Sequence, residues 1–267
     1  MILFLFLAHL GVGILWTLAF VSREAGVKFF RFNAGMAVIL IAVALAFRPA
    51  SNPADAGSGA ERVALVALLV AEAAGVCYWA TVGRGLASIR PWLVWTAMGG
   101  GAVALVAQAV GVAAGRSLPT LALTVASFVS SAALLGGACT AMILGHWYLI
   151  LPSMQVSHLQ SIVKFHIGSM VARVVVVVAA VFLAVVTWQP GTGPSFWYYI
   201  TSISGIFFWQ RVLFGLGGPA LLSFLTWETA KIRSTQSATG ILYVDFFTVV
   251  VGEVLAKYLL LATRVPV

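Results

Sequence analysis

The sequence predicts an all-α, polytopic integral membrane protein, a bundle of about eight transmembrane helices that forms a single domain over residues 1–267. Composition and hydropathy both point this way: 62% of the residues are hydrophobic, 8% are charged and the mean hydropathy is +1.07. An ordinary soluble domain carries roughly 25% charged residues. So few charged side chains could not cover a water-soluble globule of this length. The third observation is that the apolar residues are gathered into bilayer-length segments.

Eight such segments follow one another along the chain. A hydrocarbon core about 30 Å thick needs about 20 apolar residues per helix. We place the helices near residues 2–21, 32–47, 63–82, 92–114, 121–148, 163–188, 198–226 and 240–262. The second is short and the seventh is long, and the connections are too brief for a soluble domain.

The first segment is expected to be a spanning helix and not a signal peptide. Positive charge follows the apolar run at Arg23, Lys28 and Arg31 instead of preceding it, and no small-residue cleavage site closes it. The longest connection, between Arg48 and Arg62, is rich in Pro, Asn, Asp, Gly and Ser, which is typical of a solvated loop.

Small and aromatic residues mark the packing and the ends of the later segments. Glycine clusters predict close helix approaches, and they lie at Gly99 to Gly101, Gly111 with Gly115, Gly136 with Gly137, and Gly215 with Gly217 and Gly218. Aromatic residues at segment ends indicate the interfacial belt, and they are Trp92, Trp95, Trp147, Tyr148, Trp188, Trp197, Tyr198, Tyr199 and Trp227.

The net charge of +8 is interpreted as a signal of how the chain is oriented in the membrane. The odd-numbered connections carry eight basic residues, Arg23, Lys28, Arg31, Arg84, Arg90, Lys164, Lys231 and Arg233. The other connections and the tail carry four, Arg48, Arg62, Arg116 and Arg264. The positive-inside rule then predicts a bacterial-type inner (cytoplasmic) membrane with both termini outside the cytoplasm. Lipid is the expected partner, and nucleic acid is not.

Three of the four histidines fall within 21 residues, at His146, His158 and His166. Imidazole ligates haem iron and exchanges protons with quinones, and His146 and His166 lie on consecutive antiparallel segments at similar depth. A haem b with its iron on these two histidines, a quinone contact, and a structural role in the headgroup zone all stay open. His9 is a further ligand, a proton-exchanging group, or a residue that bonds a neighbouring helix.

The two cysteines, Cys77 and Cys139, lie in separate apolar runs outside any metal-ligand spacing, so neither a disulfide framework nor a zinc, copper or protein-held iron–sulfur site is expected. No phosphate loop, nucleophile elbow or other catalytic motif is present, and no catalytic residue is predicted.

Ionisable residues also lie deep in the predicted spans, where they are costly and therefore candidates for function. They are Glu72, Arg173, Arg211, Asp245, Glu253 and Lys257. Glu253 and Lys257 are spaced to pair on one helix face, which leaves Arg173 and Arg211 to seek Glu72, Asp245 or a ligand. We expect the two arginines in a cofactor pocket and the other four in a proton relay, unless all six form an ion-pair network that only fixes packing.

Two stretches near the end of the chain add a resemblance. Residues 209–219, WQRVLFGLGGP, and residues 252–258, GEVLAKY, resemble the last two helices of quinone-interacting membrane-anchor subunits of the dimethyl-sulfoxide-reductase and polysulfide-reductase type. The match covers about a fifth of the chain and carries Arg211, Glu253 and Lys257, with Lys257 where Arg is usual. It implies a quinone-binding anchor that docks to an iron–sulfur partner.

The leading expectation is therefore a membrane subunit of a respiratory or photosynthetic electron-transfer complex. It would bind quinone, haem b or both, dock to an iron–sulfur or cytochrome subunit, and act as a non-autonomous part of an oxidoreductase. Two alternatives stay open. One is a proton-coupled transporter of small solutes, which the absence of detectable inverted repeats or paired broken helices disfavours. The other is a structural scaffold subunit.

Overall fold

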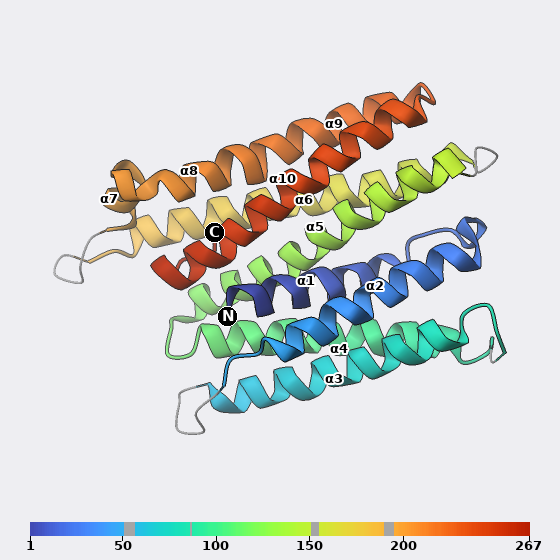
Figure 1. Ribbon diagram of the computed structural model, residues 1–267. Coiled ribbons are helices and arrows are strands. Elements are labelled where there is room, and N and C mark those ends of the chain that lie inside the picture. The colour runs from blue at the N-terminus through green and yellow to red at the C-terminus, as the bar shows by residue number, and fades with distance from the viewer. Residues whose placement is uncertain (51–56, 86, 151–154, 190–194) are drawn as a thin grey trace.

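The computed structural model describes residues 1–50, 57–85, 87–150, 155–189 and 195–267. Within these ranges the chain is helical without strands, and seven helices are long and apolar enough to cross a membrane. Figure 1 shows the long helices packed side by side in one bundle. The prediction of an all-α membrane bundle is thereby confirmed. Part of the connection between Arg48 and Arg62 lies outside the described residues.

Most helices end within a few residues of the predicted segments, whereas the helices predicted from residues 32 and 163 begin six and seven residues earlier, at Gly26 and Val156. The observed helices are α1 (Ile2–Thr17), α2 (Gly26–Ala46), α3 (Ser58–Thr81), α4 (Arg90–Val112), α5 (Leu118–Ile150), α6 (Val156–Val186), α7 (Phe196–Thr201), α8 (Ile206–Val212), α9 (Gly218–Lys231) and α10 (Thr235–Thr263). A 3-10 turn, Arg23–Ala25, precedes α2, and short 3-10 and π turns flank α8.

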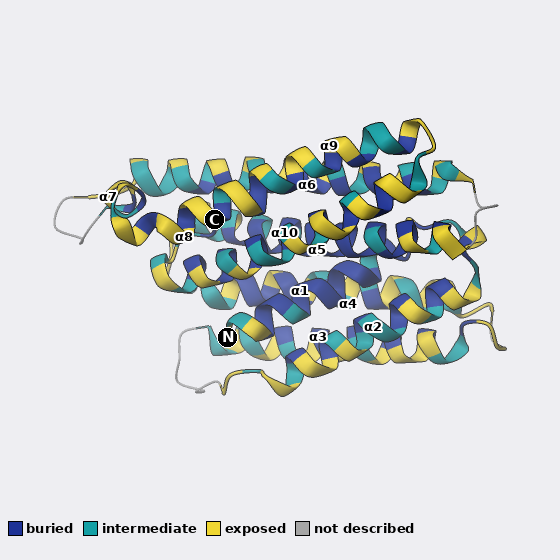
Figure 2. Ribbon diagram, turned by 45° about the horizontal axis from the view of Figure 1, so that its top comes forward, coloured by how far each residue is buried: buried dark blue, intermediate teal, exposed yellow. Residues whose placement is uncertain are grey.

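The first helix, α1, lies inside the bundle and is shorter than the seven long helices, so of the eight predicted spans the one over residues 2–21 is not among those long enough to cross a membrane. Its 16 residues extend ~24 Å at about 1.5 Å per residue, which is shorter than a hydrocarbon core. It packs against α2, α4, α5 and α10, and Figure 2 shows it as one of the most buried segments. Because protein surrounds α1, its polar side chains face other helices.

The second span is longer than predicted. The helix α2 begins at Gly26, so the prediction of a short segment from residue 32 was wrong. The hydropathy pattern stops at the basic residues, but Lys28 and Arg31 lie in the first turns of the helix, where long basic side chains reach the interface. The Arg31 guanidinium lies over the Trp79 ring, 5.2 Å from its centroid.

The seventh span is one long helix, Ile203–Lys231, as predicted, but it begins after the predicted start at residue 198 and contains a π turn. The backbone becomes extended at Ser202, between α7 and a 3-10 turn. A π turn, Leu213–Gly217, then separates α8 from α9. A π turn shifts the carbonyl register, and here the Gly215 carbonyl accepts a hydrogen bond of 2.7 Å from Nη1 of Arg211. The π turn therefore lies beside a buried charge.

Two glycine pairs bring helix backbones into contact. A Cβ on Gly136 of α5 would lie 2.1 Å from the carbonyl carbon of Gly13 on α1, and one on Gly252 of α10 would lie 2.2 Å from Cα of Gly215. Only glycine permits such approaches. The predicted packing role is confirmed for Gly136 and Gly215, whereas a Cβ on Gly99 or Gly115 would meet no atom within 4 Å.

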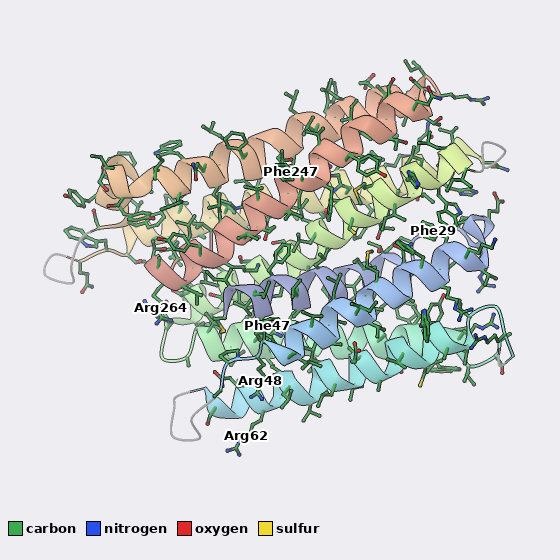
Figure 3. All side chains as sticks on the ribbon, viewed as in Figure 1. Phe29, Phe47, Arg48, Arg62, Phe247 and Arg264 are labelled. Atoms are coloured by element: carbon green, nitrogen blue, oxygen red, sulfur yellow. The ribbon has the colours of Figure 1, made fainter. Side chains whose placement is uncertain are left out.

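Both chain ends lie towards the same end of the bundle (Figure 1). The basic residues of the even-numbered connections and the tail are at this end, as the labelled Arg48, Arg62 and Arg264 show (Figure 3). We call it the terminal end. The eight basic residues of the odd-numbered connections belong to the opposite, basic end. That the basic end faces the cytoplasm remains a prediction from the positive-inside rule.

Candidate functional site

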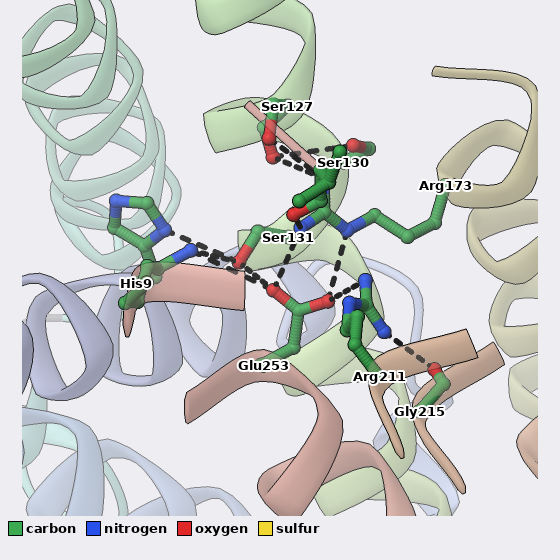
Figure 4. Close-up of polar contacts among 10 residues, drawn as sticks. His9, Ser127, Ser130, Ser131, Arg173, Arg211, Gly215 and Glu253 are labelled. Carbon is green, nitrogen blue, oxygen red and sulfur yellow. Dashed lines mark hydrogen bonds and ion pairs between the residues drawn. The ribbon is translucent and has the colours of Figure 1, made fainter. Parts of the chain in front are cut away.

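The polar centre of the bundle is the carboxylate of Glu253 on α10, which is fully buried. The contact of Gly252 with Gly215 brings α10 against the π turn and places the next residue, Glu253, beside Arg211. We call the surrounding group the Glu253 cluster; its members are His9, Ser127, Ser131, Arg173, Arg211, Glu253 and Lys257. Figure 4 shows these side chains converging on the carboxylate from five helices.

Two arginines hold the carboxylate. Arg173 of α6 binds it with both sides of its guanidinium, Nε to Oε1 at 2.9 Å and Nη2 to Oε2 at 3.2 Å. Arg211 of α8 donates from Nη2 to Oε1 at 2.8 Å. Arg173 also donates to Ser127 Oγ at 2.7 Å, and from Nη2 to the backbone oxygen of Val267 at 3.3 Å. Charge-assisted bonds of this kind are the stronger hydrogen bonds in proteins.

A lysine, a serine and a histidine complete the cluster. Ser131 Oγ donates to Glu253 Oε2 at 2.6 Å and accepts from Lys257 Nζ at 2.7 Å. Lys257 Nζ lies 3.6 Å from Glu253 Oε2, which confirms the pairing predicted from their spacing. His9 Nδ1 lies 3.2 Å from Ser131 Oγ. The close contact of Gly13 with Gly136 lays α1 on α5 and so brings His9 to Ser131.

The cluster holds three basic side chains against one carboxylate, all of them buried. If Arg173, Arg211, Lys257 and Glu253 are all ionised and His9 is neutral, the sum is +2 in a region from which bulk water is excluded. Arginine keeps its proton in proteins, whereas a buried lysine readily exists as the neutral amine. Lys257 is therefore the group through which the cluster most cheaply loses and regains a proton.

The arginines do not pair with the carboxylates that the sequence pointed to. Their partner is Glu253, so the expectation of Glu72 or Asp245 was wrong. The reason is packing: Glu72 lies on α3, which packs on α2 and α4, away from α6 and α8. Glu72 is partly exposed, and its Oε2 has no hydrogen-bond partner within the described part of the chain.

Asp245 forms a separate buried pair with His166. The distance from His166 Nε2 to Asp245 Oδ2 is 2.6 Å, and both side chains are fully buried. The approach lies outside the angular limits of a hydrogen bond. His166 and Arg173 are seven positions apart on α6, which corresponds to ~10 Å along the helix axis. The pair is thus a second buried polar site, which lies closer to the basic end of the bundle than the Glu253 cluster does.

The other two histidines point elsewhere. His146 is exposed and lies 3.2 Å from the Tyr243 hydroxyl, and His158 pairs with Glu24 at 2.7 Å. Tyr243 and Asp245 are two positions apart on α10 and face nearly opposite sides of that helix. His146 and His166 therefore do not converge on one point, and this arrangement does not fit a haem held between them. No group of three metal-ligating side chains occurs among the described residues.

Among the cavities in the described part of the chain are three that no histidine lines. The first, about 40 Å³, lies at the terminal end among α1 to α4 and includes Gln108 and Glu61 in its wall. The second, about 430 Å³, lies at the terminal end among α5, α6, α7 and α10. The third, about 440 Å³, lies at the basic end and is lined by Arg23, Arg90 and aromatic rings.

The structure thus joins some predicted site residues and separates others. It brings together His9, Arg173, Arg211, Glu253 and Lys257, and it leaves apart Glu72, His146, His158 and the pair His166 and Asp245. Sequence reasoning missed Ser127, Ser131 and Gln108. The available signal was their position inside apolar segments, five residues before Gly136 in the case of Ser131.

No protein-family model, no characterised protein and no solved structure matches this chain.

Proposed function

We propose that this chain is a membrane subunit of an electron-transfer complex, in which the Glu253 cluster exchanges protons with a quinone bound at the terminal end. The observation that carries the proposal is the buried chain of hydrogen bonds from His9 through Ser131 to Lys257 and Glu253. Ionisable groups are expensive at this depth and are typical of proton relays. A scaffold does not require a chain of exchangeable protons.

The second cavity is the best candidate for the quinone. Its volume of about 430 Å³ falls in the range of roughly 300–1,000 Å³ that small-molecule sites occupy. Phe196 and Tyr199 supply rings for a planar headgroup, and Arg116 and Arg264 supply donors. A bound quinone would supply the redox chemistry, in which electrons and protons are taken up or released together.

This cavity adjoins the Glu253 cluster. Val265 and Pro266 form part of its wall, and the adjacent Val267 accepts the hydrogen bond from Arg173. In the proposed role, Arg173 and Arg211 hold Glu253 as a fixed anion. Lys257 then carries the mobile proton, and Ser131 passes protons between Lys257 and His9. The resemblance of the last two helices to quinone-interacting anchors is consistent with this role, since Arg211, Glu253 and Lys257 carry it.

The test is purification of the assembly from its own membrane through a tag on this chain. We expect redox subunits in the preparation and a quinone in its organic extract. A preparation with neither a redox subunit nor a quinone would refute the proposal. An absorption spectrum of the same sample decides whether a haem is present anywhere in the assembly.

A pair of tryptophan variants on α6 locates the quinone. Ala184 lines the second cavity, so Ala184→Trp fills it, whereas Val178 is 62% exposed on the outer surface of α6. We expect Ala184→Trp to lose most of the bound quinone and Val178→Trp to keep it. Equal quinone content in the two variants would place the quinone elsewhere.

The π turn in the seventh span favours a second candidate, a proton-coupled transporter. π turns inside helices frequently occur at functional sites, and the π turn at Gly215 lies next to the buried Arg211. Uptake of a small solute by liposomes that contain only this chain, driven by a pH gradient and abolished by Glu253→Gln, would support the transporter over the redox subunit.

A further inference from the structure

The hydrogen bonds of the Ser131 hydroxyl determine which nitrogen of His9 carries a proton. A hydroxyl has one proton to donate and two lone pairs. Ser131 donates to the Glu253 carboxylate, which can only accept, and it accepts from Lys257. Its remaining lone pair faces His9 Nδ1 at 3.2 Å, so Nδ1 carries the hydrogen. In the neutral ring, Nε2 then has an open lone pair.

A buried amide lies on α4, one of the helices that pack against the His9 helix, α1. Figure 4 shows one ring nitrogen of His9 directed at Ser131 and the other directed away from the Glu253 cluster. Gln108 of α4 is 5% exposed, and it lines the same cavity as Leu5, which lies one helical turn before His9 on α1. Yet His9 Nε2 and both amide atoms of Gln108 lack a direct hydrogen bond within the described residues. Leaving buried polar atoms without a hydrogen bond is unfavourable, and an ordered water that bonds to them removes this cost.

Gln108 also lines the first cavity, together with Leu5 and Gly111. The cavity measures about 40 Å³, and a buried water needs roughly 10–15 Å³ on this scale. It therefore has room for a few water molecules and none for an organic solute. Its wall includes Met1 and Arg48, which places its mouth at the terminal end.

We infer that the first cavity is a water site that connects the Glu253 cluster to the aqueous phase at the terminal end, with His9 as the relay. A proton taken from water at His9 Nε2 releases the Nδ1 proton to Ser131 Oγ. Ser131 passes its own hydroxyl proton to Lys257 when that amine is neutral. The water site stands on its own geometry, and only the use of the proton rests on the proposed function.

Radiolytic labelling of the full chain in nanodiscs tests the site. Short X-ray pulses in H₂¹⁸O generate hydroxyl radicals from water, including buried water, and mass spectrometry then reads the ¹⁸O gained by each side chain. His166 is the matched control, because it is the same residue type and is equally buried but lies beside Asp245 on α10, whereas the helix of His9 packs on α4, which carries the cavity residue Gln108. We expect His9 to gain label several-fold faster than His166.

A second labelling experiment uses a variant that lacks the Gln108 amide. Gln108→Leu keeps the approximate size of the side chain but offers the water no hydrogen bond, so we expect labelling of His9 to fall to the level of His166. Equal labelling of the two histidines in the natural chain, or unchanged labelling of His9 in Gln108→Leu, would overturn the water site. Labelling as expected in an assembly without quinone or redox subunits would retain the site and refute the proposed function.

Discussion

Replacement of Glu253 by glutamine should destabilise the bundle more than any other single isosteric change. The carboxylate receives bonds from Arg173, Arg211 and Ser131 at 2.6–3.2 Å. Glutamine has one acceptor oxygen, and its NH₂ group would face guanidinium donors. Removal of one partner from a buried ion pair typically costs about 3–5 kcal/mol. Here Arg173, Arg211 and Lys257 lose the carboxylate side chain that they share, so we expect the upper part of that range.

The assay is reversible unfolding in mixed micelles titrated with SDS. Glu228→Gln is the control, because Glu228 pairs with Lys231 at 2.7 Å but both side chains are 46% exposed. Exposed pairs contribute about 0–1 kcal/mol, which is small beside the change expected for Glu253→Gln. If the two variants lose equal stability, the carboxylate is not the electrostatic centre of the bundle and the reasoning fails.

Three further outcomes are expected in the same assay. Adding Lys257→Met to Glu253→Gln restores the original charge sum of the Glu253 cluster and should recover part of the lost stability; an additive loss would contradict this. Gly252→Ala places a Cβ 2.2 Å from Cα of Gly215 and should cost about 1–3 kcal/mol, whereas Gly240→Ala, with no atom within 4 Å, should be neutral. Trp147→Phe removes the 3.1 Å bond from Nε1 to the Ala25 carbonyl and should cost about 1 kcal/mol; unchanged stability would show that water replaces this bond.

Hydropathy predicted the fold because each span must form all of its backbone hydrogen bonds within itself in lipid. The length and composition of a span can therefore be recognised from its own stretch of sequence. The interruption at Ser202 and the π turn were not readable in this way. The π turn lies where Gly215 meets Gly252 of α10, and a one-dimensional profile does not contain contacts between helices. The start of α2 was misplaced because basic residues in a first turn resemble a loop in such a profile.

The candidate site was predictable in part for the same reason. The spacing of Glu253 and Lys257 lies within one helix, and the sequence alone predicted that they pair. The approach of Arg173 and Arg211 to Glu253 joins three helices, and choosing Glu253 over Asp245 required knowing which turn of α10 faces α6. Ser131 was not predicted as a site residue because an uncharged serine in an apolar segment gives no signal, although its hydroxyl links His9 to the carboxylate.

The position of Glu253 also bears on how the protein enters its membrane. Arg173 and Arg211 belong to α6 and α8, which leave the ribosome before α10. Until α10 arrives, both guanidinium groups lack the carboxylate that neutralises them, and an arginine at the centre of a span costs about 2.5–3.5 kcal/mol during insertion. Until then, the insertion machinery or α5 must keep the two arginines of the sixth and seventh spans out of contact with lipid. Synthesis of α10 then supplies the carboxylate and completes the assembly.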